Sequence, residues 1–94
     1  MSLRQLMDLR EAATAITKHG ARVLVAGHSS AGEPSSLSDK RARAVIATLK
    51  KYGVPAAQLS YRGYGASNPR DTDSSVAGAK RNQRAEIIIL EVSK

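Results

Sequence analysis

The sequence predicts an α+β fold, a two-layer sandwich in which two helices cover one face of a small mixed sheet. Two segments carry apolar residues at helical spacing, and each of them ends at a glycine. Three short apolar or alternating runs have the length and composition of strands, which gives the order helix, strand, helix, strand, strand. Because the chain has only 94 residues, we expect a single domain spanning residues 1–94 with one modest core.

The first helix leads directly into a strand. Apolar residues recur along one face of the opening segment, namely Leu6, Leu9, Ala13 and Ile16. Gly20 follows His19 and is well suited to the left-handed position that ends a helix. Residues 22–26 form a short, largely apolar run directly after this stop, which predicts a strand covered on both faces.

A second helix is predicted after a loop rich in glycine, serine and proline over residues 27–36. Its start is placed at Ser36, with Asp39 as the capping-box partner three residues later. The positions expected to be buried are Ala42, Val45, Ile46 and Leu49. Gly53 ends this helix.

Two more strands are predicted in the second half of the chain. Residues 59–62 alternate in polarity and end at Gly63, whereas residues 85–92 contain three consecutive isoleucines and form the clearest strand. Residues 66–83 between them form a long polar stretch, in which we expect one helical turn near residues 76–81.

The composition limits the classes of partner. Fifteen Lys and Arg residues against eight Asp and Glu residues give a net charge of +7, which suggests an anionic partner or surface. With three tyrosines and no Phe or Trp, side chains that stack on bases are few, so we expect a solvated basic face and no nucleic-acid partner. The absence of cysteine excludes disulfide scaffolds and Cys-based zinc or redox sites.

No apolar stretch is long enough to span a membrane. Membrane attachment is therefore expected only through segments outside this chain, and residues 1–3 are interpreted as an addition from the expression vector.

Catalytic sites are poorly supported, and we expect no enzyme, cofactor or metal. The strand leading into Gly27-His28-Ser29 is similar to a nucleophile elbow, but position 31 is Ala and both histidines precede Ser29. His19 and His28 are interpreted as solvent or turn residues, because two histidines without cysteine make a weak metal set. Asp71 and Asp73 are interpreted as turn formers. Gly63-Tyr64-Gly65 by itself is too short to indicate nucleotide binding.

Several motifs taken in order are nevertheless specific. An aliphatic strand runs into Gly27-His28-Ser29-Ser30, and a loop leads to Leu37-Ser38-Asp39-Lys40-Arg41-Ala42-Arg43-Ala44-Val45. Gly53-Val54, Gly63-Tyr64-Gly65-Ala66-Ser67-Asn68-Pro69 and Asn82-Gln83-Arg84-Ala85-Glu86-Ile87 follow. This series covers nearly the whole chain, and it resembles the OmpA-like peptidoglycan-binding domain family.

The resemblance implies a non-catalytic module of the periplasmic face of the bacterial envelope, which anchors an outer-membrane or inner-membrane protein to the cell wall. Members of the family hold the diaminopimelate of the peptidoglycan stem peptide without a covalent bond. An aspartate ending Gly-His-Thr-Asp accepts from the ligand's ammonium, and the arginine of Leu-Ser-x-x-Arg pairs with its carboxylate. In this chain Arg41 matches that arginine and Ser30 stands at the aspartate position. The other residues expected around the ligand are Ser29, Asn82 and Arg84.

The departures from the family pattern fall at this site. A serine in place of the aspartate supplies no charge, which costs about 1–3 kcal/mol or roughly ten- to a hundredfold in affinity. Glu33 in the same loop is a candidate substitute carboxylate. The family's βαβαββ order also lacks its first strand here, and the unpaired sheet edge that results favours a homodimer.

Two functions therefore remain open. The first is a peptidoglycan-binding module with weakened or altered binding. The second is a degenerate copy of the same fold that acts as a protein-interaction or assembly module without binding peptidoglycan.

Overall fold

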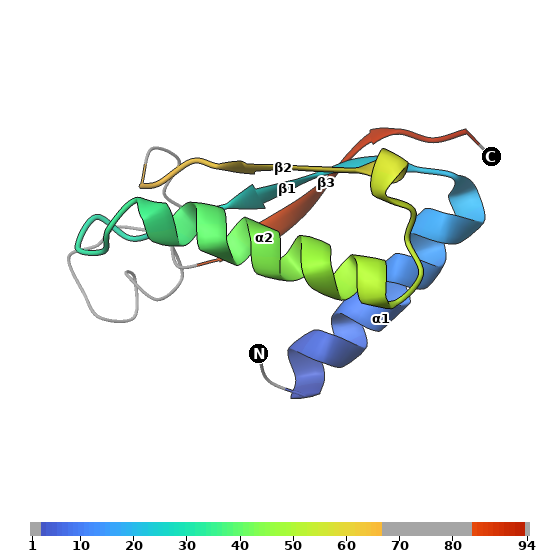
Figure 1. The fold of residues 1–94 in the computed structure, drawn as a ribbon, viewed down its shortest axis with the longest axis horizontal. Helices are drawn as coiled ribbons and strands as arrows, with labels where there is room; N and C mark the ends of the chain where they lie inside the picture. Colours follow the sequence, from blue (N-terminus) through green and yellow to red (C-terminus); the bar gives the residue numbers. More distant parts are fainter. Residues whose placement is uncertain (1–2, 67–83, 94) are drawn as a thin grey trace.

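Two helices lie on one face of a three-stranded sheet in the computed structural model, which describes residues 3–66 and 84–93 (Figure 1). The elements are α1 (Leu3–His19), β1 (Arg22–Gly27), α2 (Ser36–Lys51), a short 3-10 helix η1 (Ala56–Gln58), β2 (Leu59–Gly63) and β3 (Ala85–Glu91). This order confirms the predicted α+β fold. The helical turn expected near residues 76–81 lies outside the described residues.

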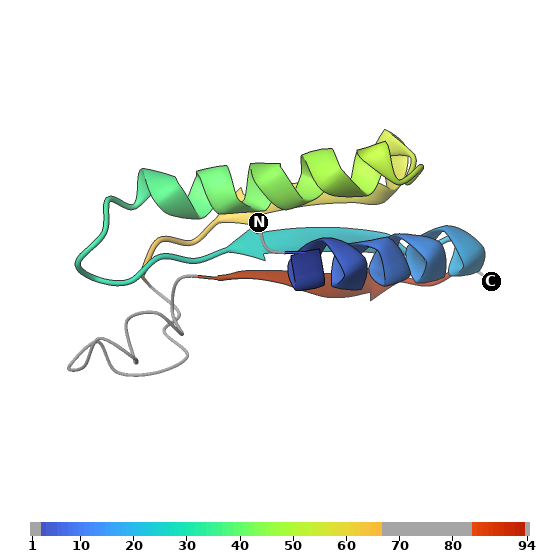
Figure 2. The same cartoon turned by 90° about the horizontal axis from the view of Figure 1, so that it is seen from below.

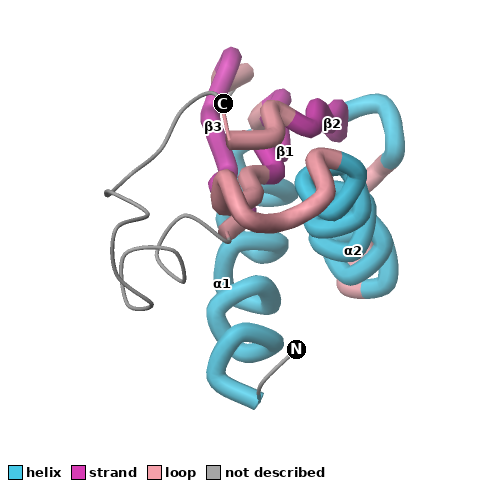
Figure 3. Tube along the Cα trace, turned by 90° about the vertical axis from the view of Figure 1, so that its left-hand side faces the viewer, coloured by secondary structure: helices cyan, strands magenta, loops and turns pink. Residues whose placement is uncertain are grey.

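The sheet is mixed, with strand order β2-β1-β3. Its central strand β1 pairs in parallel with β2 and antiparallel with β3, and the end view shows both helices below these strands (Figure 3). Val23 and Val25 face the helices and are buried, whereas Leu24 on the opposite face is only half-buried. The prediction that this strand is covered on both faces is therefore wrong at Leu24, because both helices lie on the same side (Figure 2).

The core is aliphatic, as the composition predicts. Its buried members come from α1, α2 and β1 and from the turns that follow both helices: Ala13, Ile16, Ala21, Val23, Val25, Ala42, Ile46, Leu49 and Val54. The predicted stripe of α2 is confirmed, with Val45 at its half-buried margin. The side-chain amide of Gln58 donates to the carbonyls of Ile16 and Ala21, so η1 is linked to the end of α1 and to the turn that follows it.

The helix stops and the start of α2 at Ser36 are confirmed, but the predicted capping box is wrong. Gly20 and Gly53 have φ angles of 57° and 96°, which β-carbon-bearing residues rarely adopt. The N-cap is Ser35 and not Ser36, and it forms no side-chain capping bond. Its backbone is already helical (φ −61°, ψ −24°), whereas a capping side chain needs an extended N-cap residue to reach the first amides. Asp39 instead pairs with Arg43 at 2.9 Å.

The first turn of α2 lies directly on two paired glycines of the sheet. Gly27 at the end of β1 is opposite Gly63 at the end of β2. A β-carbon at Gly27 would lie 1.8 Å from the carbonyl oxygen of Ser38, and one at Gly63 would lie 2.8 Å from the amide nitrogen of Asp39. Only glycine allows this close approach between helix and sheet.

We expect Gly27→Ala to destabilise the fold by at least about 3 kcal/mol, because the new methyl group overlaps backbone that has no room to move. Urea unfolding of the purified domain measures the change. Gly32→Ala is the matched control, since a β-carbon there meets nothing within 4 Å, and we expect it to change stability by less than about 0.5 kcal/mol. Equal midpoints for the two variants would contradict the close approach.

Candidate functional site

The candidate site lies where β1 ends and the loop to α2 begins. The chain beyond Gly27 remains bound on both sides, because the His28 amide donates to the carbonyl of Arg84 at 2.6 Å and the Ser29 amide donates to that of Gly65 at 2.9 Å. Residues 28 and 29 therefore continue the pairing of β1 and form a rigid start to the loop.

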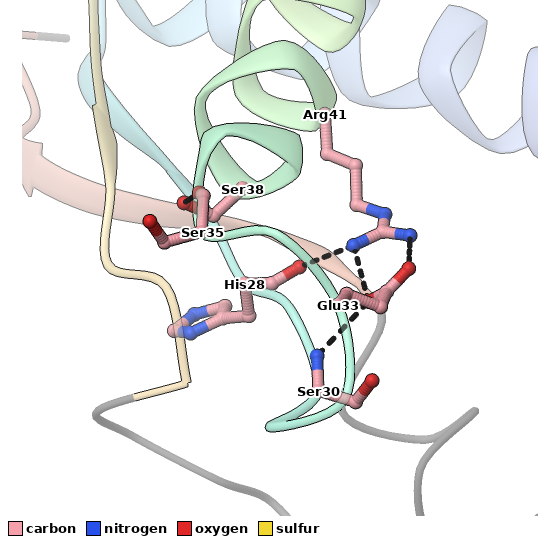
Figure 4. A network of polar contacts seen from close by, with 6 residues as sticks. All are labelled: His28, Ser30, Glu33, Ser35, Ser38 and Arg41. Carbon is pink, nitrogen blue, oxygen red and sulfur yellow. Dashed lines mark hydrogen bonds and ion pairs between the residues drawn. The ribbon is translucent and has the colours of Figure 1, made fainter.

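Ser38 joins this loop to the first turn of α2. Its buried hydroxyl donates to the carbonyl of Ser35 at 2.7 Å and accepts from the amide of Gly65 at 2.9 Å. Since Gly65 also holds Ser29, the serine loop, the turn after β2 and the helix share one set of hydrogen bonds. Arg41 projects from α2 one turn further on (Figure 4).

Arg41 forms a two-point ion pair with Glu33. Its Nη1 donates to Glu33 Oε1 at 2.9 Å and its Nη2 donates to Oε2 at 2.6 Å, while Nη1 also donates to the carbonyl of His28 at 3.1 Å (Figure 4). The Arg41 side chain is 27% exposed and that of Glu33 is 17% exposed, so the pair lies at the surface but is partly shielded from water. Bidentate, partly buried pairs of this kind are the stronger class of ion pair.

A tight turn brings Glu33 to this position. The Glu33 amide donates to the carbonyl of Ser30 at 3.1 Å, and the Ser30 amide donates back to Glu33 Oε1 at 2.9 Å. The hydrogen bonds from Arg41 lower the pKa of Glu33 below its ordinary value of 4.5, and they outweigh the opposing effect of burial. Glu33 is therefore a carboxylate at neutral pH, beside the position that the serine at residue 30 leaves uncharged.

Arg41 keeps donors that these contacts do not use. A guanidinium has five N–H groups, and the bonds to Glu33 and His28 account for three of them. The Nε–H and the second Nη2–H share one edge of the group, and neither has a partner among the described residues. This edge matches the two oxygens of a further carboxylate.

The His28 ring lies behind the loop and is 5% exposed. It stacks on Tyr64 with the ring centres 5.7 Å apart, and the guanidinium of Arg62 lies 5.1 Å from the centre of the same tyrosine ring. Burial lowers the pKa of His28 below its ordinary value of 6.5, the Arg84 guanidinium lowers it further, and the Glu86 carboxylate opposes them. The interpretation of His28 as a solvent or turn residue is therefore wrong, whereas His19 is exposed.

The structure brings together only some of the site residues that the sequence predicts. Arg41, Glu33 and the amide of Ser30 come together, but the side chains of Ser29 and Ser30 are almost fully buried. Ser29 Oγ has no hydrogen-bond partner in the part of the chain that the structure describes. Arg84 pairs with Glu86 on β3, and Asn82 lies outside the described residues, as do Asp71 and Asp73.

The structural role of the Gly63-Tyr64-Gly65 segment was not predicted from the sequence. Gly63 allows the close approach of α2, Tyr64 stacks on His28, and Gly65 (φ 60°) hydrogen-bonds both Ser29 and Ser38. The two flanking glycines were the available signal, since paired glycines at strand ends indicate a close backbone approach.

The described residues contain no group of three or more His, Cys, Asp or Glu side chains that could hold a metal ion. Within the same residues no helix is long and apolar enough to cross a membrane.

These observations define the class of domain as an α+β sandwich with a partly buried arginine in the second turn of its second helix. A family model described as the OmpA family matches residues 3–83, which is most of the chain, and the chain belongs to this family.

Individual relatives agree with this assignment. The outer-membrane lipoprotein YfiB of Pseudomonas aeruginosa is 38% identical over 58 residues, which are 62% of this chain and 34% of the lipoprotein. The chain thus corresponds to about a third of that relative. The C-terminal domain of Helicobacter pylori MotB matches with a TM-score of 0.89 and 26% identity, over 97% of this chain and 75% of that one. The cell wall anchor of the T6SS from Pseudomonas aeruginosa matches with a TM-score of 0.79 and 27% identity, over 97% and 70% of the two chains.

We expect Glu33→Gln to lower the free energy of unfolding at pH 7 by about 1–3 kcal/mol, because a partly buried guanidinium loses its charged partner. The pKa of Glu33 is lowered in the fold, so its contribution is present above pH 4.5 and is lost as the pH falls through the folded-state pKa. Urea unfolding at pH 7 and pH 3 measures both effects, and the gap between variant and wild type should be smaller at pH 3 than at pH 7. Asp39→Asn removes the exposed ion pair with Arg43 and should cost no more than about 0.5 kcal/mol.

Proposed function

We propose that this domain binds peptidoglycan without catalysing a reaction, and that Arg41 and Glu33 together hold the diaminopimelate of its stem peptide. In this proposal the domain faces the bacterial periplasm and anchors an envelope protein to the cell wall. One observation carries it: a carboxylate lies beside the family's arginine although the family's aspartate position is Ser30.

The chemistry of the ligand fits the groups on this surface. The free end of diaminopimelate is a zwitterion, so it needs one acceptor for its ammonium and one cation for its carboxylate. The unused edge of Arg41, Nε–H with Nη2–H, offers a two-point contact for the carboxylate.

Glu33 would supply the acceptor for the ammonium. Its carboxylate accepts from the Ser30 amide and from Arg41, and the Ser30 side chain also hydrogen-bonds it, so the ammonium would share a carboxylate that is already well coordinated. Glu33 Oε2 lies next to the Nη2 atom that would hold the ligand's carboxylate. Because Glu33 shares its charge with Arg41, we expect weaker binding than an unshared acid would give.

The family assignment and one relative add support from outside the site. The domain belongs to the OmpA family, and the Pseudomonas aeruginosa structure at 27% identity is a cell wall anchor. The YfiB relative is an outer-membrane lipoprotein, which agrees with an envelope protein as the parent of this domain.

The second candidate function is a protein-interaction or assembly module. Glu33 already occupies donors of both Nη atoms of Arg41, and in this function the ion pair would close Arg41 to ligands. Along β3 and directly after it, moreover, large apolar side chains are exposed: Ile88, Ile89, Leu90 and Val92. β3 is an edge strand, and an apolar hollow lies beside it between Ile16, His19 and Ile89. An exposed apolar edge of this kind suits pairing with a second copy.

The two functions predict opposite effects of removing Glu33. If Glu33 accepts the ammonium, Glu33→Ala weakens binding about tenfold, whereas if it blocks Arg41, the same change strengthens binding. Arg41→Ala should weaken binding about a hundredfold. Calorimetric titration with a diaminopimelate-containing muropeptide measures these changes, and a lysine-containing muropeptide, which lacks the distal carboxylate, is the ligand control.

Arg43→Ala is the matched protein control, because Arg43 lies on the same helix in an exposed ion pair and should leave the affinity unchanged. Absence of saturable binding at millimolar muropeptide would exclude peptidoglycan binding. Saturable binding that ignores the Arg41 change would leave the function standing but exclude this site.

For the assembly module, light scattering at about 100 µM protein should show a dimer that Ile89→Lys converts to a monomer, since the change places a charge on the apolar edge. Met7→Lys is the control, because Met7 on α1 is about as exposed as Ile89 and lies away from β3. A monomeric mass for the wild-type domain would count against self-association through this strand.

A further inference from the structure

His28 contacts the candidate site with its backbone and a separate cluster with its ring. Its carbonyl accepts a hydrogen bond from Arg41 Nη1, the same atom that donates to Glu33. Its ring points away from this ion pair, toward the turn after β2 (Figure 4). A change in how the ring is held is therefore transmitted to Arg41 through a single residue.

The ring lies between groups from two strands. Tyr64, which follows β2, stacks on it, and Arg62 of β2 lies over that tyrosine. Arg84 and Glu86, from the start of β3, provide the nearest charges on the other side. On the carbonyl side are Arg41 and Glu33.

This environment favours a neutral ring. The imidazole is buried, and its Nδ1 has no hydrogen-bond partner within residues 3–66 and 84–93. A proton on the ring would add a cation near Arg84, with Glu86 as the opposing charge among the described residues, and would place a buried N–H at Nδ1 without an acceptor there.

We propose that His28 is a positioning residue for the Arg41–Glu33 pair: its neutral, stacked ring holds the carbonyl that orients Arg41, and protonation of the ring weakens ligand binding. This inference rests on the proposed function. It makes wall binding by the domain sensitive to mild acid, although Glu33 stays ionised there because its pKa is lowered.

A change in ligand affinity between about pH 5 and 7.5 can be assigned to histidine. The pKa of Glu33 is lowered from 4.5, so this group stays ionised above pH 5, and the ammonium and carboxylate of diaminopimelate do not titrate between about pH 5 and 7.5. The chain has two histidines, His28 and the exposed His19. Because the pKa of His28 is lowered from 6.5, binding is retained at pH 6.5 and declines as the pH falls further.

The experiment measures the ratio of the dissociation constants for a diaminopimelate-containing muropeptide at pH 5.0 and pH 7.5. We expect a ratio of about three to ten for the wild-type domain. His28→Phe stacks on Tyr64 but carries no titrating group, and its ratio should fall to one, whatever its affinity at pH 7.5. His28→Gln, which is also neutral throughout, replaces it if the phenylalanine variant fails to fold.

His19→Gln is the matched control and should keep the wild-type ratio. A wild-type ratio of one, or a wild-type ratio in both His28 variants, would overturn the role of His28 while leaving binding at pH 7.5 intact. Loss of binding at both pH values would instead mark a failure of the proposed function.

A measurement on the ligand-free domain keeps the inference testable in that case. In NMR spectra the Arg41 Nε–H resonance should shift with the same midpoint as the His28 ring, and that midpoint should lie below 6.5. A His28 titration that leaves the Arg41 resonance unmoved would overturn the coupling.

Discussion

The arrangement of the site depends on the contact between the first turn of α2 and the paired glycines of β1 and β2. Gly27 and Gly63 have no side chains, so the backbone around Ser38 and Asp39 comes to rest on the sheet itself. This contact sets the distance between α2 and the sheet, and at that distance Arg41 reaches the loop after β1. A methyl group at either glycine would push α2 away from the sheet. Arg41 would then move away from the His28 carbonyl and from Glu33.

The carboxylate beside Arg41 comes from the loop after β1, three residues beyond position 30. The turn from Ser30 to Glu33 folds back on itself, with each residue donating its amide to the other, so the glutamate side chain covers the space beside position 30. Glu33 lies three residues beyond Ser30 in the sequence, and its long side chain spans the distance back to this space. The Arg41 guanidinium therefore has a carboxylate partner although residue 30 is a serine.

The elements could be predicted from periodicity and glycine positions, because apolar spacing and left-handed stops are local properties; Gly20 and Gly53 behave as expected. Arg41 and Glu33 were also identified in advance, through motif order and loop proximity. The capping box at the start of α2 was wrongly predicted because capping depends on the backbone angles of Ser35, which composition does not reveal. The burial of His28 and its stack on Tyr64 join residues 36 positions apart, and only the register of β1 with β2 brings them together.

The Arg41–Glu33 pair joins residues that are close together in the sequence, whereas the sheet joins strands that are far apart in it. Within the described residues the polar contacts of this pair fall between positions 28 and 41, whereas the ion pair between β1 and β3 joins Arg22 to Glu91. The hydrophobic core lies outside the loop of residues 28–35. A change in the length of residues 30–35, or in the position of their acid, would therefore alter the surroundings of Arg41 without replacing any residue of that core.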